Sequence, residues 1–86
     1  MLQISYSKKF LKGYSKLPEN IRKKTDKQTV ILLQDMFYPS LNTKKMGGSD
    51  VWEARVDKHY RFTFSKTEGS ITFLTAGPHD EGLGKK

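Results

Sequence analysis

Apolar and polar residues alternate along residues 51–65, a pattern typical of two antiparallel strands joined by a tight turn. The apolar side of this hairpin carries Trp52, Ala54, Val56, Tyr60, Phe62 and Phe64. The polar side carries Glu53, Arg55, Arg61 and Thr63. With a three-residue loop at positions 57–59, Arg55 lies directly across from Arg61, which is unfavourable unless an anion lies between them.

The N-terminal segment predicts a short strand followed by a helix. Apolar and polar residues alternate over residues 2–6, so we expect a strand with one buried face. Ser7 is a typical N-cap for a helix over residues 8–17. The apolar stripe of this helix consists of Phe10, Tyr14 and Leu17.

The remaining segments complete a small α+β fold. A second helix is predicted over residues 19–37, with a basic first half and an apolar second half. Turn-forming residues fill positions 38–50, which we expect to be a loop. A turn at 67–70 leads into a final strand over 71–76, which Gly77-Pro78 ends. The predicted order is strand, helix, helix and three-strand meander, giving a four-stranded, mainly antiparallel sheet with both helices on one face.

Composition adds a strong positive charge. The chain has 16 Lys+Arg against 9 Asp+Glu, a net charge of +7, which favours a polyanion or an acidic protein as partner. No cysteine is present, so thiolate metal sites and disulfides are excluded. No signal peptide or membrane-spanning apolar run is visible, and the histidines have no metal-ligand spacing. We expect one cytoplasmic domain over residues 1–86, without membrane contact, metal or cofactor.

The polar side of the predicted sheet carries groups suited to RNA cleavage. When the RNA's own 2′-hydroxyl attacks the phosphate, the reaction needs a base, an acid and cations. His79 titrates in the right range for the acid or base, and Glu53 is a candidate base. Arg55 and Arg61 are suited to grip the phosphate. We expect Arg61 to lie beside Ala76, with His79 a few residues beyond.

Further residues are expected to contact RNA. The candidate phosphate-binding residues are Lys23, Lys27, Lys44, Lys45 and Lys58, with Asp80 in the same site. The alternative for each lysine is an ordinary solvated surface. For Arg55 the alternative is a cross-strand salt bridge with Glu53 or Asp57.

Four short motifs resemble the RelE/ParE superfamily of bacterial and archaeal toxins, over nearly the whole chain from Leu2 to Glu81. They are Lys45-Met46-Gly47, Trp52-Glu53-Ala54-Arg55-Val56, Tyr60-Arg61-Phe62 and Ala76-Gly77-Pro78-His79-Asp80. The resemblance implies a RelE-like fold, mRNA cleavage in the ribosomal A site, and a small antitoxin as partner. It assigns Arg61 to the scissile phosphate, His79 to proton transfer, and a 2′,3′-cyclic phosphate as the product.

Two departures from the family pattern keep alternatives open. Many members carry an aromatic residue after the histidine, where this chain has Gly82-Leu83-Gly84. RelE itself has two lysines on the second strand, where this chain has Val51 or Trp52 and Glu53. The alternatives are a ParE-like inhibitor of DNA gyrase and a catalytically inactive relative that only binds antitoxin or RNA. His79 favours the ribonuclease.

Overall fold

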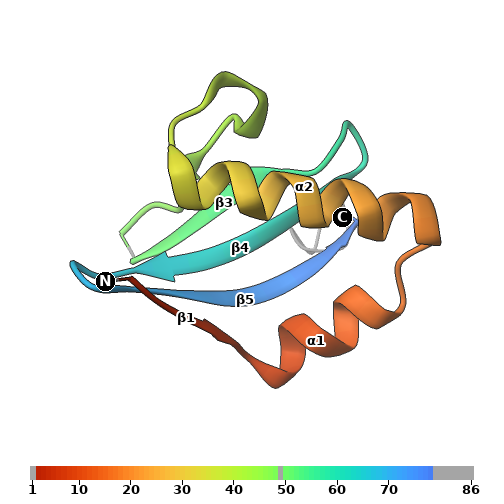
Figure 1. Ribbon diagram of the computed structural model, residues 1–86, viewed down its shortest axis with the longest axis horizontal. Helices are drawn as coiled ribbons and strands as arrows, with labels where there is room; N and C mark the ends of the chain where they lie inside the picture. The colour runs from red at the N-terminus through yellow and green to blue at the C-terminus, as the bar shows by residue number, and fades with distance from the viewer. Residues whose placement is uncertain (1, 49, 79–86) are drawn as a thin grey trace.

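The computed structural model describes residues 2–48 and 50–78, which form one sheet and two α-helices (Figure 1). The elements are β1 (Gln3–Tyr6), α1 (Lys8–Ser15), α2 (Glu19–Gln34), the 3-10 helix η1 (Pro39–Leu41), β2 (Lys44–Lys45), β3 (Val51–Arg55), β4 (Tyr60–Lys66) and β5 (Ser70–Pro78). The strand order is β1-β5-β4-β3-β2, with β1 parallel to β5 and all other neighbours antiparallel. The predicted α+β class and the order of the main elements are confirmed.

The predicted boundaries were wrong at several places. The first helix ends at Ser15 rather than at residue 17. Residues 38–50, expected to be a loop, contain η1 and the two-residue strand β2, which adds a fifth strand to the sheet. The second helix ends at Gln34 rather than at residue 37, because Asp35 adopts an extended conformation (φ −158°, ψ 97°). The carboxylate of Asp35 then accepts a hydrogen bond from the amide of Phe37 (3.0 Å).

The last strand also runs further than predicted, through Gly77 to Pro78. Pro78 pairs with Tyr60 of β4 on one edge. On the other edge of β5, the pairing with β1 ends at Phe73. Among the described residues, Pro78 therefore has no strand on that side to which a backbone N–H would have to donate. A proline is therefore compatible with this end of the strand.

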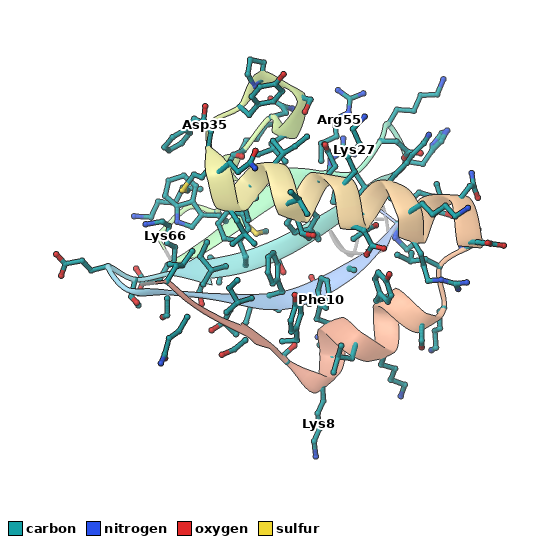
Figure 2. All side chains as sticks on the ribbon, viewed as in Figure 1. Lys8, Phe10, Lys27, Asp35, Arg55 and Lys66 are labelled. Atoms are coloured by element: carbon teal, nitrogen blue, oxygen red, sulfur yellow. The ribbon has the colours of Figure 1, made fainter. Side chains whose placement is uncertain are left out.

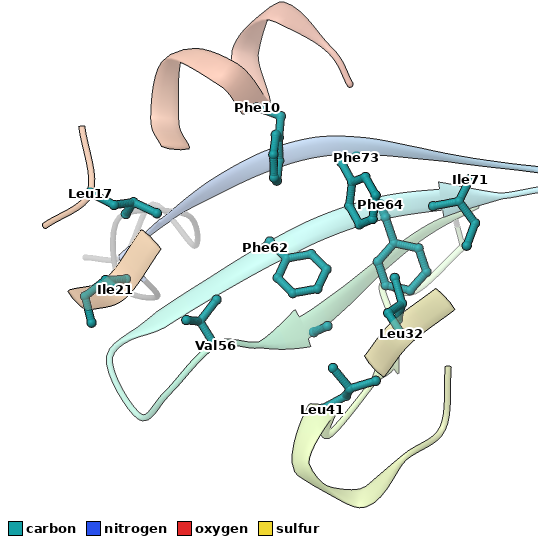
Figure 3. Packing of buried hydrophobic residues seen from close by; sticks show 11 residues of the cluster. Phe10, Leu17, Ile21, Leu32, Leu41, Val56, Phe62, Phe64, Ile71 and Phe73 are labelled. Atoms are coloured by element: carbon teal, nitrogen blue, oxygen red, sulfur yellow. The ribbon is translucent and has the colours of Figure 1, made fainter. Parts of the chain in front are cut away.

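Both helices pack their apolar residues on the same face of the sheet (Figure 1). The rings of Phe62, Phe64 and Phe73 are fully buried at the centre of this layer (Figure 3). Phe10 from α1 lies 5.5 Å from Phe73, measured between ring centroids, and Leu32 covers the sheet from α2. The predicted apolar side of the β3–β4 hairpin thus forms the middle of the core.

The N-terminal strand does not have the buried face that alternation predicted. Ile4 is 42% exposed and Tyr6 51% exposed, because β1 is an edge strand. Tyr6 nevertheless stacks on Phe73, with 5.3 Å between ring centroids. Phe37, the last residue of the predicted second helix and part of its apolar half, lies outside α2, is 65% exposed and contacts Trp52 edge-on.

The helix α1 is fixed to β5 by a cap and a glycine. The Ser7 hydroxyl accepts a hydrogen bond from the amide of Phe10 (3.0 Å), which confirms the predicted N-cap. The same hydroxyl donates to the carbonyl oxygen of Leu74 (2.7 Å). Further along the helix, a side chain on Gly13 would overlap the carbonyl oxygen of Ala76. The helix therefore approaches β5 more closely than any larger residue at position 13 would allow.

Candidate functional site

Two cross-strand rows bring the predicted site residues together on the sheet face opposite the helices. The first row consists of Lys44, Glu53, Thr63 and Thr75. The second consists of Arg55, Arg61 and Gly77. Because residues directly opposite one another share a face, the rows form one polar surface next to the end of β5. The predicted pairing of Arg55 with Arg61 is confirmed.

A β-bulge changes the position of β5 relative to this surface. Thr63 pairs with Thr75, whereas Phe64 pairs with Phe73, so Leu74 is an extra residue on β5. As a result Arg61 lies opposite Gly77, and the predicted position beside Ala76 was wrong. Opposite Arg61 there is consequently no side chain, which leaves room above the backbone of β5 at this point.

Arg61 is held by the backbone of the hairpin loop. Its Nη1 donates to the carbonyl oxygens of Asp57 (2.6 Å) and Tyr60 (3.0 Å). A guanidinium carries five N–H donors in a planar fork, so two bonds from Nη1 leave donors for a phosphate. The loop carbonyls thus orient the guanidinium without using its full binding capacity.

Asp57 fixes the loop that holds Arg61. Its Oδ1 accepts hydrogen bonds from the amides of His59 (2.8 Å) and Tyr60 (3.1 Å), and its Oδ2 lies 3.7 Å from Nζ of Lys24. Burial alone would raise the pKa of this carboxyl. The two amides and the charges of Lys24 and His59 outweigh burial, so the pKa lies below its ordinary value of 3.8.

Sequence reasoning named Asp57 only as a possible partner of Arg55 and missed its part in building the loop. The available signal was an aspartate at the first loop position, where its side chain can bind amides two and three residues on. The predicted alternative, a salt bridge from Arg55 to Asp57, is not formed within the described residues. The carboxylate of Asp57 forms an ion pair with Lys24 instead.

Arg55 lies in different surroundings from Arg61. It lines a cavity of about 600 Å³ where α2, η1 and the end of β3 meet, which we call the α2–β3 cavity. Lys24 and Lys27 line it from α2, and Tyr38 lines it beside η1. Figure 2 shows Arg55 and Lys27 near each other on the side of α2 away from α1. Sequence reasoning placed Lys27 in the site but missed Lys24 and Tyr38.

The other predicted lysines are spread over the surface. Lys44 and Lys45 are exposed on β2, and Lys44 is in register with Glu53. Lys58 is exposed at the hairpin tip. Lys23 is exposed on α2, where it pairs with Glu19 at 3.8 Å, and it is not among the residues that line the α2–β3 cavity. Of these, Lys44 shares a row with one predicted catalytic residue, Glu53.

His79 and Asp80 lie outside the described residues. The last described residue, Pro78, pairs with Tyr60, the neighbour of Arg61 on β4. Within residues 2–48 and 50–78, no three His, Cys, Asp or Glu side chains gather where they could hold a metal ion. None of the helices in this part of the chain has the length and apolar character needed to span a membrane.

Several solved structures have the same architecture as this chain over nearly its full length. It is similar to YafQ from E. coli (TM-score 0.81, 14% identity, covering 98% of this chain and 100% of that one). It is similar to the E. coli DinJ-YafQ toxin-antitoxin complex (TM-score 0.82, 17% identity, covering 96% and 98%). The archaeal RelE-RelB complex from Pyrococcus horikoshii matches with a TM-score of 0.74 at 20% identity, covering 90% and 93%.

No family model matches the chain, and no curated protein matches it in sequence. The likeness is therefore one of three-dimensional structure, over nearly the full length of both chains. The chain has the fold of the RelE, YoeB and YafQ toxins, as the sequence motifs had implied.

Proposed function

We propose that this protein is the toxin of a toxin–antitoxin pair and that it cleaves messenger RNA on the ribosome. The fold supports the first part, because its structural neighbours are toxins of this type and several were solved together with an antitoxin. The net charge of +7 suits both an RNA substrate and an acidic antitoxin. Such a protein acts in the cytoplasm.

The observation that carries the ribonuclease proposal is the pairing of Arg55 with Arg61 on the polar surface. Two like charges opposite one another destabilise a sheet unless an anion lies with them. Phosphate is an anion that arginine binds through paired hydrogen bonds. An RNA backbone across this surface would turn an unfavourable pair into a binding site.

The proposed reaction needs no metal. Glu53, two residue pairs along the sheet from Arg61 and on the same face, takes the proton from the 2′-hydroxyl. The freed oxygen attacks phosphorus, and the bond from phosphorus to the 5′-oxygen breaks. Arg61 stabilises the extra negative charge on the phosphorane. His79 supplies the proton to the departing 5′-oxygen, and the product ends in a 2′,3′-cyclic phosphate.

The test is primer extension on translated messages after induced expression. Wild-type protein should give new cleavage sites. Arg61→Ala should reduce cleavage about 100-fold or more, because removing one donor that stabilises the transition state has an effect of that size. His79→Gln should reduce cleavage as well. Lys8→Ala, which removes an exposed cation from the start of α1, is the matched control and should cleave like the wild type.

Growth arrest with intact messages would overturn the ribonuclease proposal. If DNA supercoiling is blocked at the same time, the gyrase-inhibitor alternative is the better description. Harmless overexpression would favour the catalytically inactive relative. Each variant is first compared with the wild type by thermal unfolding, since Arg61 also binds two loop carbonyls.

A further inference from the structure

The α2–β3 cavity has the size of a ligand site. Its volume of about 600 Å³ falls within the range of pockets that hold small ligands. The strand β2 pairs with Trp52 and Glu53, and within residues 2–48 and 50–78 no strand lies beside the edge of β3 beyond Glu53. Arg55 occupies this uncovered end, which places it between the polar surface and the cavity.

The charge around the cavity is not balanced within the described residues. Lys24, Lys27 and Arg55 contribute three positive charges, and Asp57 contributes one negative charge. Asp57 is already committed to Lys24 and to two loop amides. Neither Lys27 nor Arg55 forms an ion pair with a carboxylate in the described part of the chain. The cavity therefore attracts an anion.

Gln28 holds the walls of the cavity in place. This side chain is 7% exposed, and its Nε2 donates to the carbonyl oxygens of Arg55 (2.7 Å) and Ser40 (3.2 Å). Its Oε1 lies 3.4 Å from the Ser40 hydroxyl. The amide thus joins α2, η1 and the end of β3. These hydrogen bonds fix the backbone of Arg55, which lines the cavity, to the side chain of α2 that also binds η1.

Tyr38 adds an aromatic ring to the charged cavity. It is 48% exposed although it is a large side chain, and its backbone is fixed by hydrogen bonds to Asp35 (3.0 Å) and from Leu41 (3.0 Å). Single-stranded RNA is bound by such a combination: cations hold the phosphates, and an exposed ring stacks on a base. A simple anion would need no ring beside the cations.

We propose that the α2–β3 cavity binds one nucleotide of single-stranded RNA that flanks the cleaved bond. Arg55 and Lys27 bind its phosphate, and Tyr38 stacks on its base. This inference rests on the proposed function, since it concerns the same RNA strand. Arg55 lies directly across from Arg61, so a strand with its scissile phosphate at Arg61 reaches the cavity with a neighbouring nucleotide.

The test measures binding separately from cleavage. A short fluorescent oligonucleotide with 2′-O-methyl groups cannot be cut by 2′-hydroxyl attack, and its affinity follows from fluorescence anisotropy at several salt concentrations. Lys27→Ala should lower the slope of log affinity against log salt by about 0.7, the value for one phosphate contact on a single strand. Lys8→Ala, at the other end of the molecule in Figure 2, should leave the slope unchanged.

Tyr38 is tested with a pair of variants. Tyr38→Leu should weaken binding by roughly 5- to 100-fold, the range for losing one base stack, without a change in the salt slope. Tyr38→Phe keeps the ring and should bind like the wild type. This pair separates stacking from the loss of a hydroxyl.

Several outcomes would overturn the subsite. One is that Lys27→Ala and Tyr38→Leu bind the oligonucleotide like Lys8→Ala, even if the wild type cleaves messages. Another is that the wild type does not bind the oligonucleotide at all. A third is that polyglutamate displaces the RNA while Tyr38→Leu has no effect, which would indicate an acidic protein segment instead. If both variants weaken binding but no message is cleaved, the subsite stands and the cleavage proposal fails.

Discussion

The two helices cover the sheet in different ways. On the β5 side, α1 packs so closely that a side chain on Gly13 would overlap the carbonyl oxygen of Ala76, and Ser7 ties the start of the helix to the strand. On the β3 side, α2 reaches the end of the strand through the side chain of Gln28, and a cavity of about 600 Å³ remains beside it.

The α1–β5 contact is thus a tightly packed region, whereas the region around the α2–β3 cavity is open and polar. The α1–β5 contact contains aromatic rings and a glycine, whereas the α2–β3 cavity is lined by cations and by an exposed tyrosine. Exposed charges contribute little to stability, and tight packing contributes much. We therefore expect substitutions at the α1–β5 contact to change stability and those around the cavity to change binding.

The largest effect is expected for Gly13→Ala. The new methyl group would overlap the carbonyl oxygen of Ala76, so α1 and β5 must move apart. Overpacking of this kind exceeds the gain in helix propensity, and we expect a net loss of about 3 kcal/mol in the free energy of unfolding. Urea denaturation measures this loss.

Gly69→Ala is the matched control, because a methyl group there meets no atom within 4 Å. It should change the free energy of unfolding by less than about 0.5 kcal/mol, as expected for an exposed position. Equal losses in the two variants would contradict the close α1–β5 contact.

A smaller loss is expected for Gln28→Leu, on the open side. The substitution keeps the approximate size of the side chain but removes both hydrogen bonds to the carbonyl oxygens of Arg55 and Ser40. We expect a loss of about 2 kcal/mol, because two carbonyls lose their donor. Oligonucleotide affinity should fall too, since Arg55 is no longer fixed. Gln34→Leu, at the exposed end of α2, should alter neither quantity.

The smallest effect concerns Asp57, which joins the hairpin tip to α2 through Lys24. Asp57→Asn keeps an oxygen for the loop amides and removes the charge. At neutral pH it should lower stability by about 1 kcal/mol, because hydrogen bonds to a charged acceptor are stronger.

The difference between Asp57→Asn and the wild type should depend on pH. Since folding lowers the pKa of Asp57 below 3.8, the stabilisation is present above that value. It is lost as the pH falls through the pKa of the folded state. Urea denaturation at neutral and at acid pH measures the free energy of unfolding of both proteins. If their difference is the same at acid pH as at neutral pH, the charge of Asp57 has no part in holding the loop.

The sequence was sufficient for the parts of the fold that follow from local rules. The period of two in residues 51–65 and the length of the loop predicted both strands of the hairpin and placed Arg55 across from Arg61. Ser7 marked the start of α1 for a similar reason, since its hydroxyl acts within one turn. Neither feature needs knowledge of distant residues.

Features that depend on distant contacts could not be predicted in the same way. No residue near Leu74 indicates the bulge that brings Gly77 opposite Arg61. Lys27 and Arg55 share a cavity only because Gln28 joins α2 to the end of β3. For the candidate site, the sequence thus supplied the residue types and one cross-strand pair. The position of Lys27 beside Arg55 and the presence of Tyr38 there needed the structure.

The parallel pairing of β1 with β5 affects how the chain folds while it is being synthesised. Ser7 forms its hydrogen bond with Leu74, a residue 67 positions later in the sequence. Contacts so far apart in sequence form slowly, because a long loop must close first. A nascent chain that ends before β5 has an N-terminal strand with no partner and an α1 with no strand to pack on. The protein therefore stays incomplete, and its proposed activity absent, until translation has passed the last strand.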